Sequence, residues 1–143
     1  MLNISIGSDH AGFQLKSFLI EKNSSSYIFS DIGPFDSQSV DYPEYAHAVA
    51  KDVLENKADF GVLICGSANG VAITANKHKG IRAAIAWLPE LAALARQHND
   101  ANIICIPARF IDEENAQEIL NVFLNTNFEG GRHQNRVNKI DCL

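Results

Sequence analysis

The centre of the chain reads Phe60-Gly61-Val62-Leu63-Ile64-Cys65-Gly66-Ser67-Ala68-Asn69-Gly70. Its first six residues form a continuous apolar run, which is typical of a central strand covered by helices on both faces. The five residues after Cys65 are small and include two glycines, so they predict a tight turn into a following helix. A buried strand followed by such a turn and a helix is the repeating unit of a parallel α/β sheet.

Four further segments rich in β-branched or aromatic residues occur at residues 2–6, 27–32, 83–87 and 102–106. Between the strands, apolar residues recur at helical steps of three and four, as in Ala46, Val49, Ala50, Val53 and Leu54, and in Ala116, Ile119, Leu120 and Phe123. Five strands that alternate with five helices predict a parallel sheet within three layers. No repeat or domain boundary interrupts the pattern, so residues 1–143 are expected to form a single domain.

The residues from 41 to 44 have the pattern of a helix start. Asp41 stands three positions before Glu44, and Pro43 falls in the first turn. This spacing predicts a capping box with an early-helix proline.

Composition limits the classes of partner. The 143 residues are 46% hydrophobic and carry 12 Lys and Arg against 17 Asp and Glu, a formal charge of −5. This charge repels nucleic acid and anionic membranes, so an anionic ligand needs a local basic cluster. No apolar run approaches the ~20 residues of a membrane span, and the first residues resemble a strand rather than a signal peptide. We therefore expect a cytoplasmic protein whose three cysteines remain thiols.

Three loops are candidates for ligand binding. In open parallel sheets, ligands bind beyond the carboxyl ends of the strands, which selects residues 7–12, 65–70 and 107–109. Backbone N–H groups between Gly66 and Gly70 could hold an anion or oxyanion, helped by a helix expected over residues 71–77. A tight strand-to-helix turn explains the same glycines equally well. The GxGxxG and GxxxxGK[ST] nucleotide motifs are absent.

The cysteines have different expected roles. Cys65 ends a strand where a helix begins, a setting in which a thiolate can act as a base or nucleophile. The alternative is a small buried hydrophobe, which is the interpretation we prefer for Cys105. Cys142 stands beside no feature that indicates a role.

Other polar residues also allow two interpretations. His98 could donate a proton near neutral pH or cap the last carbonyls of its helix. In the Asp9-His10 pair, Asp9 could bind a ligand or only form a turn. The residues from 130 to 139 are basic, and the spacing of Arg132 and Arg136 puts both on one face of a helix, where they could hold a phosphate. A solvated basic tail is the alternative.

The ordered motifs resemble those of the type B ribose-5-phosphate isomerases, in the family that also holds allose-6-phosphate isomerases and the subunits of galactose-6-phosphate isomerase. The resemblance spans essentially the whole chain. It depends on Ser8-Asp9-His10-Ala11-Gly12, Asp41-Tyr42-Pro43, Cys65-Gly66-Ser67 with Gly70, Ala75-Asn76-Lys77, Gly80-Ile81-Arg82-Ala83, Arg96-Gln97-His98-Asn99-Asp100-Ala101-Asn102 and Gly130-Gly131-Arg132-His133 with Arg136-Val137.

The resemblance implies a Rossmann-like three-layer α/β/α sandwich with a five-stranded parallel sheet, no metal and no cofactor. It implies a homodimer with active sites shared between subunits, and leaves a tetramer open. The implied reaction interconverts ribose 5-phosphate and ribulose 5-phosphate, in the pentose phosphate pathway, through an enediolate. Cys65 would be the base and His98 would open the sugar ring. The oxyanion would be held by Ser67 and by the turn of Gly66, Ala68, Asn69 and Gly70. The sugar hydroxyls would be bound by Asp9 and Asn99. The phosphate would be bound by His10, Arg109, Arg132 and Arg136.

One departure bears on the substrate. Many family members have Cys-Gly-Thr-Gly where this chain has Cys65-Gly66-Ser67-Ala68, so the turn carries extra side chains, including that of Asn69. One branch of the family uses a glutamate downstream as the base, but Val71, Ala72 and Ile73 offer no carboxylate. A six-carbon sugar phosphate and a non-catalytic sugar-phosphate binding module remain as alternatives.

Overall fold

The computed structural model describes residues 1–141. Five strands form one sheet in the order β2-β1-β3-β5-β4, and every neighbouring pair is parallel. The predicted central strand is β3, with β1 and β5 on its two sides. The strands are β1 (Asn3–Ser8), β2 (Ile28–Gly33), β3 (Phe60–Cys65), β4 (Ala83–Ile85) and β5 (Ile103–Pro107).

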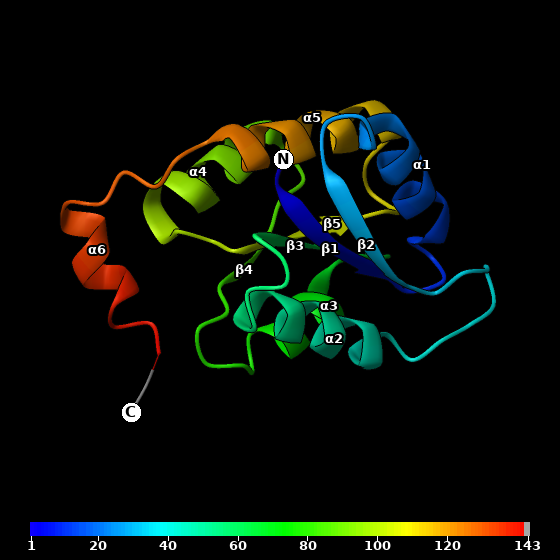
Figure 1. The fold of residues 1–143 in the computed structure, drawn as a ribbon, viewed down its shortest axis with the longest axis horizontal. Coiled ribbons are helices and arrows are strands. Elements are labelled where there is room, and N and C mark those ends of the chain that lie inside the picture. The colour runs from blue at the N-terminus through cyan, green and yellow to red at the C-terminus, as the bar shows by residue number, and fades with distance from the viewer. Residues whose placement is uncertain (142–143) are drawn as a thin grey trace.

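Helices cover both faces of the sheet, which confirms the three layers. Figure 1 shows α1, α4 and α5 on one face, α2 and α3 on the other, and α6 beyond the end of α4. None of the helices in the described part of the chain has the length and hydrophobicity that a membrane crossing requires. The helices are α1 (Phe13–Asn23), α2 (Tyr42–Leu54), α3 (Asn69–Ala75), α4 (Pro89–Asn99), α5 (Glu113–Asn125) and α6 (Arg132–Val137).

The continuous apolar run of β3 is explained by a core on each face. Val62 and Ile64 belong to the core under α1, α4 and α5, whereas Leu63 and Cys65 belong to the core over α2 and α3. All four side chains are buried. Successive residues of a strand point to opposite faces, so a strand with a core on both sides needs an apolar residue at every position.

Some predicted boundaries move by one or two residues. The first strand extends to Ser8, because Gly7 and Ser8 continue the pairing with Leu63 and Ile64 of β3. The strand predicted over residues 83–87 ends at Ile85, and the helix expected from residue 71 begins at Asn69.

The predicted capping box at α2 is wrong, although Asp41 does occupy the N-cap position. The Asp41 side chain makes no capping hydrogen bond, and the N–H of Glu44 instead donates to the Asp41 carbonyl at 3.4 Å. Pro43 takes the second helical position and has no N–H, so it removes one of the two usual donors to a capping side chain.

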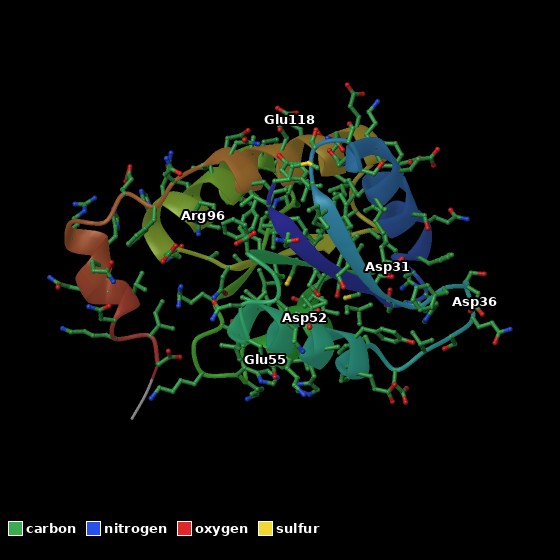
Figure 2. All side chains as sticks on the ribbon, in the orientation of Figure 1. Asp31, Asp36, Asp52, Glu55, Arg96 and Glu118 are labelled. Atoms are coloured by element: carbon green, nitrogen blue, oxygen red, sulfur yellow. The ribbon has the colours of Figure 1, made fainter. Side chains whose placement is uncertain are left out.

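Lys16 is a buried cation that the sequence patterns did not reveal. Its side chain is 1% exposed, and its Nζ lies 2.6 Å from Oδ1 of Asp31 and donates to the Pro34 carbonyl at 2.7 Å. The same ammonium lies 5.5 Å and 5.4 Å from the ring centres of Phe13 and Phe35. Asp31 belongs to β2 (Figure 2), so these contacts attach α1 to the end of β2 and to the loop that leads to α2.

We predict that Lys16→Met lowers the free energy of unfolding by about 2 kcal/mol. Breaking a buried pair costs about 3 to 5 kcal/mol, but solvent recovers part of this because Asp31 remains one-third exposed. Urea unfolding measures the change, with the exposed Lys22→Met on the same helix as the control. Equal unfolding midpoints for the two variants would show that the buried contacts contribute no stability.

Candidate functional site

Three loops meet at the carboxyl edge of the sheet, as the sequence predicted. The N–H of Asp9, after β1, donates to the Ile64 carbonyl at 3.0 Å. After β5, the N–H groups of Ala108 and Arg109 donate to the carbonyls of Cys65 and Gly66 at 2.9 and 3.1 Å. Backbone hydrogen bonds therefore attach the first loop to the end of β3, and the last loop to Cys65 and to the turn that follows it.

The turn after Cys65 presents polar side chains to solvent. Cys65 is the last residue of β3 and is 5% exposed, whereas Ser67 and Asn69 are exposed, and the Asn69 N–H donates to Ser67 Oγ at 3.3 Å. Ala68 is buried and adopts a left-handed conformation with φ of 66°, which costs a residue with a side chain about 1 kcal/mol. Ser67 and Asn69 line a cavity of about 520 Å³ together with Ile85, Trp87, Pro107 and Phe110.

The glycines of this turn allow two side chains to approach it. A Cβ atom on Gly66 would lie 3.1 Å from Nη1 of Arg109, so the guanidinium rests against the Gly66 backbone. A Cβ atom on Gly70 would overlap the ring of Tyr42. Tyr42 is therefore a neighbour of the turn, although its Asp41-Tyr42-Pro43 motif gave no indication of a role.

Asp9 and His10 enter the site in different ways. Oδ1 of Asp9 accepts a hydrogen bond from the Gly12 N–H at 2.9 Å, so this carboxylate does form the turn that was the alternative to ligand binding. Nδ1 of His10 is buried without a hydrogen-bond partner among residues 1–141. A buried polar atom without a partner is typical of a position that a ligand or water completes.

The remaining predicted residues lie at the opposite, amino edge of the sheet. His98 and Asn99 end α4, which runs back from the carboxyl edge to the start of β5, and Arg132 and Arg136 belong to α6 beside it. The six residues of β3 span about 17 Å, because each step along a strand rises about 3.3 Å. One chain therefore separates its predicted site residues into two groups, one at each edge.

His98 belongs to a cluster with Glu129 and His133. The rings of His98 and His133 stack with centres 4.2 Å apart and planes 12° from parallel. Oε1 of Glu129 lies 3.5 Å from His98 Nε2 and 3.6 Å from His133 Nε2. Burial lowers the pKa of His133, with smaller effects from His98 and Arg132.

The same three residues are the candidate metal ligands of the described chain. Their ligand atoms lie within 4.8 Å of one another, and two histidines with a glutamate can hold zinc. However, a metal in the plane of one imidazole lies outside the plane of a parallel neighbour, and Arg132 and Arg136 add positive charge. The arrangement is therefore better suited to placing hydrogens on the two histidines than to binding a metal ion.

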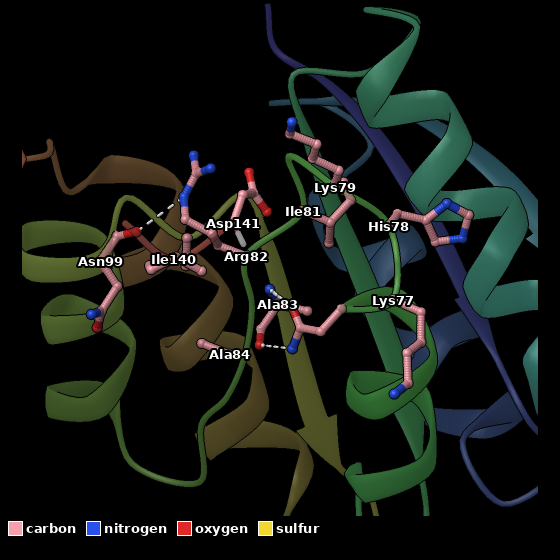
Figure 3. Close-up of a pocket in the computed structure, with 12 residues that line it drawn as sticks. Lys77, His78, Lys79, Ile81, Arg82, Ala83, Ala84, Asn99, Ile140 and Asp141 are labelled. Atoms are coloured by element: carbon pink, nitrogen blue, oxygen red, sulfur yellow. Dashed lines mark hydrogen bonds between the residues drawn. The ribbon is translucent and has the colours of Figure 1, made fainter. Parts of the chain in front are cut away.

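A second cavity opens at the amino edge. It has a volume of about 760 Å³, and Arg82 and Asn99 contribute to its lining, with Arg82 Nε donating to the Asn99 carbonyl at 3.1 Å (Figure 3). Asn76 holds the opposite wall through paired hydrogen bonds with the backbone of Ala83, at 2.8 and 2.9 Å. The cavity places open space beside the Asn99 end of α4.

Cys105 takes the structural role expected of it. It is fully buried in β5, and burial raises the pKa of its thiol, with a smaller effect from the nearby Cys65. A thiol that resists ionisation does not compete with Cys65 as a base. Cys142 lies outside the described residues.

Together the fold and the site define a Rossmann-like α/β protein that gathers ligand-binding loops at the carboxyl edge of a parallel sheet. The chain belongs to the ribose/galactose isomerase family, whose model matches residues 4–140.

Comparisons with individual proteins agree with this family. The chain is 45% identical over 142 residues to a protein of Mycoplasma genitalium named probable ribose-5-phosphate isomerase B, covering 96% of this chain and 93% of that protein. A crystal structure of a ribose 5-phosphate isomerase from Thermotoga maritima matches with a TM-score of 0.96 and 46% identity, covering 98% and 97% of the two chains. The structure of ribose-5-phosphate isomerase B from Mycoplasma genitalium with bound ribulose-5-phosphate matches with a TM-score of 0.92 and 44% identity, covering 96% and 93%.

We predict that Gly12→Ala destabilises the carboxyl edge by about 2 to 3 kcal/mol, the usual cost of overpacking. The new Cβ would lie 2.6 Å from the Ile64 carbonyl oxygen, and a backbone atom of β3 cannot move aside. Gly7→Ala is the control, because its Cβ would meet the Val49 side chain at 3.2 Å. Chemical unfolding compares the two; a smaller loss for Gly12→Ala would contradict the close approach.

Proposed function

We propose that this protein is a ribose-5-phosphate isomerase, which interconverts ribose 5-phosphate and ribulose 5-phosphate in the cytoplasm as a step of the pentose phosphate pathway. The observation that carries the proposal is the Cys65 thiol at the end of β3, beside a turn of small residues open to ligand. The named relatives and the relative solved with ribulose-5-phosphate support this substrate.

In the proposed reaction, Cys65 is the general base. Its thiolate takes the proton from C2 of the open-chain aldose, and the electron pair moves onto the carbonyl oxygen at C1 to give a 1,2-enediolate. The thiol then returns a proton to C1 while the C2 hydroxyl loses its proton to O1, giving the ketose. This proton transfer needs a base and an oxyanion site but no redox group.

The turn after Cys65 is proposed to hold the developing oxyanion. Ser67 Oγ and the backbone N–H groups between Gly66 and Gly70 lie next to the thiol along the chain, where donors stabilise charge that forms only during the reaction. Arg109 rests against Gly66, and His10 has its unpartnered Nδ1, so both are available for the phosphate. The phosphate is remote from C1 and C2, and its binding energy orients them against the thiol.

A second copy of the chain is proposed to complete the site. His98, Asn99, Arg132 and Arg136 lie at the amino edge and cannot reach Cys65 of their own chain across the length of the sheet. In a homodimer, His98 of the partner subunit would open the furanose ring and the partner's Arg132 would bind the phosphate.

Exposed apolar side chains support this dimer. Trp87 is 52%, Ile73 62% and Phe110 74% exposed, and Trp87 and Phe110 line the cavity beside Ser67. Large exposed apolar residues gathered around a cavity are typical of a surface that a partner covers. The site of one chain would then be closed by the chain that supplies its missing residues.

We predict that Cys65→Ala lowers isomerisation of ribose 5-phosphate at least about 100-fold, the typical contribution of a general base. Binding of the sugar phosphate is retained, because the arginines and the turn remain. NMR in D₂O follows both ribulose 5-phosphate formation and deuterium uptake by the sugar.

Ser24→Ala on the surface is the matched control and keeps wild-type activity. Full activity in Cys65→Ala would remove the thiol from the reaction. If the wild-type protein converts allose 6-phosphate or galactose 6-phosphate but not ribose 5-phosphate, the proposed substrate is wrong; if it binds these sugars and converts none, it is a binding module.

A further inference from the structure

The cluster of His98, His133 and Glu129 contains two residues to which the proposed reaction gives no role. His133 is a titratable residue that is only 7% exposed. Its ring stacks on the flat face of the His98 ring. Glu129 is half exposed, yet a single oxygen of its carboxylate faces Nε2 of both rings at nearly equal distances of 3.5 and 3.6 Å. The three groups converge from the end of α4, the start of α6 and the segment between α5 and α6.

The backbone holds this cluster together. The Glu129 N–H donates to the Gln97 carbonyl at 3.0 Å, which fixes the acid beside the last turn of α4. Gly130 and Gly131 follow with φ of 69° and 56°, conformations that residues with side chains rarely adopt. They turn the chain into α6 (Figure 1). The ring of His133 in α6 then stacks against the ring of His98.

The shared oxygen favours a hydrogen on the ring nitrogen of each histidine that faces it. A neutral imidazole has a hydrogen on one ring nitrogen and a lone pair on the other. A lone pair on Nε2 of either ring would face the negative Oε1 of Glu129, whereas an N–H at that position is attracted to it. The form with hydrogen on Nε2 is therefore favoured in both rings, which leaves the lone pair of His98 on Nδ1.

His133 suits the role of a neutral neighbour. Its ring is buried, and burial lowers the pKa of His133, with further lowering by His98, Arg132 and Arg136 that outweighs the opposite effect of Glu129. A neutral His133 can therefore stack against His98 without competing with it for the Glu129 carboxylate as a second imidazolium. His98, whose side chain is 40% exposed, is the ring of the pair that a sugar can reach.

We propose that Glu129 and His133 are positioning residues that present His98 to the sugar with hydrogen on Nε2 and a free lone pair on Nδ1. This inference rests on the proposed function. Nδ1 takes the proton of the C1 hydroxyl, the bond from C1 to the ring oxygen breaks, and its electron pair stays on that oxygen. The imidazolium then gives the same proton to the former ring oxygen, while the Glu129 carboxylate stabilises the transient charge.

The test compares Glu129→Gln and Glu129→Asp with Glu118→Gln, an exposed acid on α5 that serves as the control. Nitrogen-15 NMR of the free protein identifies which nitrogen of His98 carries hydrogen. We expect hydrogen on Nε2 in the wild type and in Glu118→Gln, and a mixture of the two forms in Glu129→Gln. Glu129→Asp keeps the charge and retains more of the Nε2–H form.

Kinetics then separates ring opening from proton transfer at carbon. Ribulose 5-phosphate has its O5 esterified and cannot close a furanose ring, so deuterium exchange at its C1 needs no ring opening. Glu129→Gln is expected to slow conversion of ribose 5-phosphate about 10- to 100-fold and to change the exchange less than about twofold. The loss in conversion is no larger than the lower end of the contribution of a general acid or base, because His98 itself remains in place.

Two results would overturn the inference. One is a wild-type His98 with its hydrogen on Nδ1; the other is an equal loss of conversion and exchange in Glu129→Gln, which is what general damage to the site would produce. Failure of the proposed function appears differently, because a wild-type protein that converts no ribose 5-phosphate would still report the position of the His98 hydrogen.

Discussion

The parallel pairing of the strands is the constraint on which the rest of the molecule depends. Each strand must be followed by a helix that runs back, so the chain always leaves the sheet at one edge and enters it at the other. Residues that follow strands gather near Cys65, whereas residues at the end of α4 and in α6 gather near His98. The fold therefore separates the two groups of predicted site residues along the length of the strands. This separation is the reason for proposing that two copies of the chain complete each site.

The sequence was sufficient to predict the elements that follow simple periodic patterns. The continuous run before Cys65 identified the central strand, and the alternation of strands and helices identified the layers. The three loops at the carboxyl edge followed from topology alone, since all strand ends in a parallel sheet point the same way. The resemblance to a family suggested a role for each of these residues. The fold is compatible with those roles but does not test them.

The remaining features depend on contacts between distant segments. Lys16 reads as a surface residue of a helix, and only its position three residues before the buried Leu19 hints that it faces inward. Glu129 and His133 join His98 across more than thirty residues, through a turn whose two glycines adopt positive φ. The left-handed Ala68 contradicts the local preference of its residue type, so no pattern of propensities predicts it.

We propose that each active site combines the carboxyl edge of one subunit with the amino edge of another. The most direct test of this arrangement is a heterodimer of Cys65→Ala and His98→Asn chains, purified through two different affinity tags and assayed for conversion of ribose 5-phosphate. One of its two sites would contain both native residues, so a shared site predicts about half of the wild-type activity, although each variant alone is impaired. A heterodimer no more active than the two separate variants would contradict a site shared between subunits.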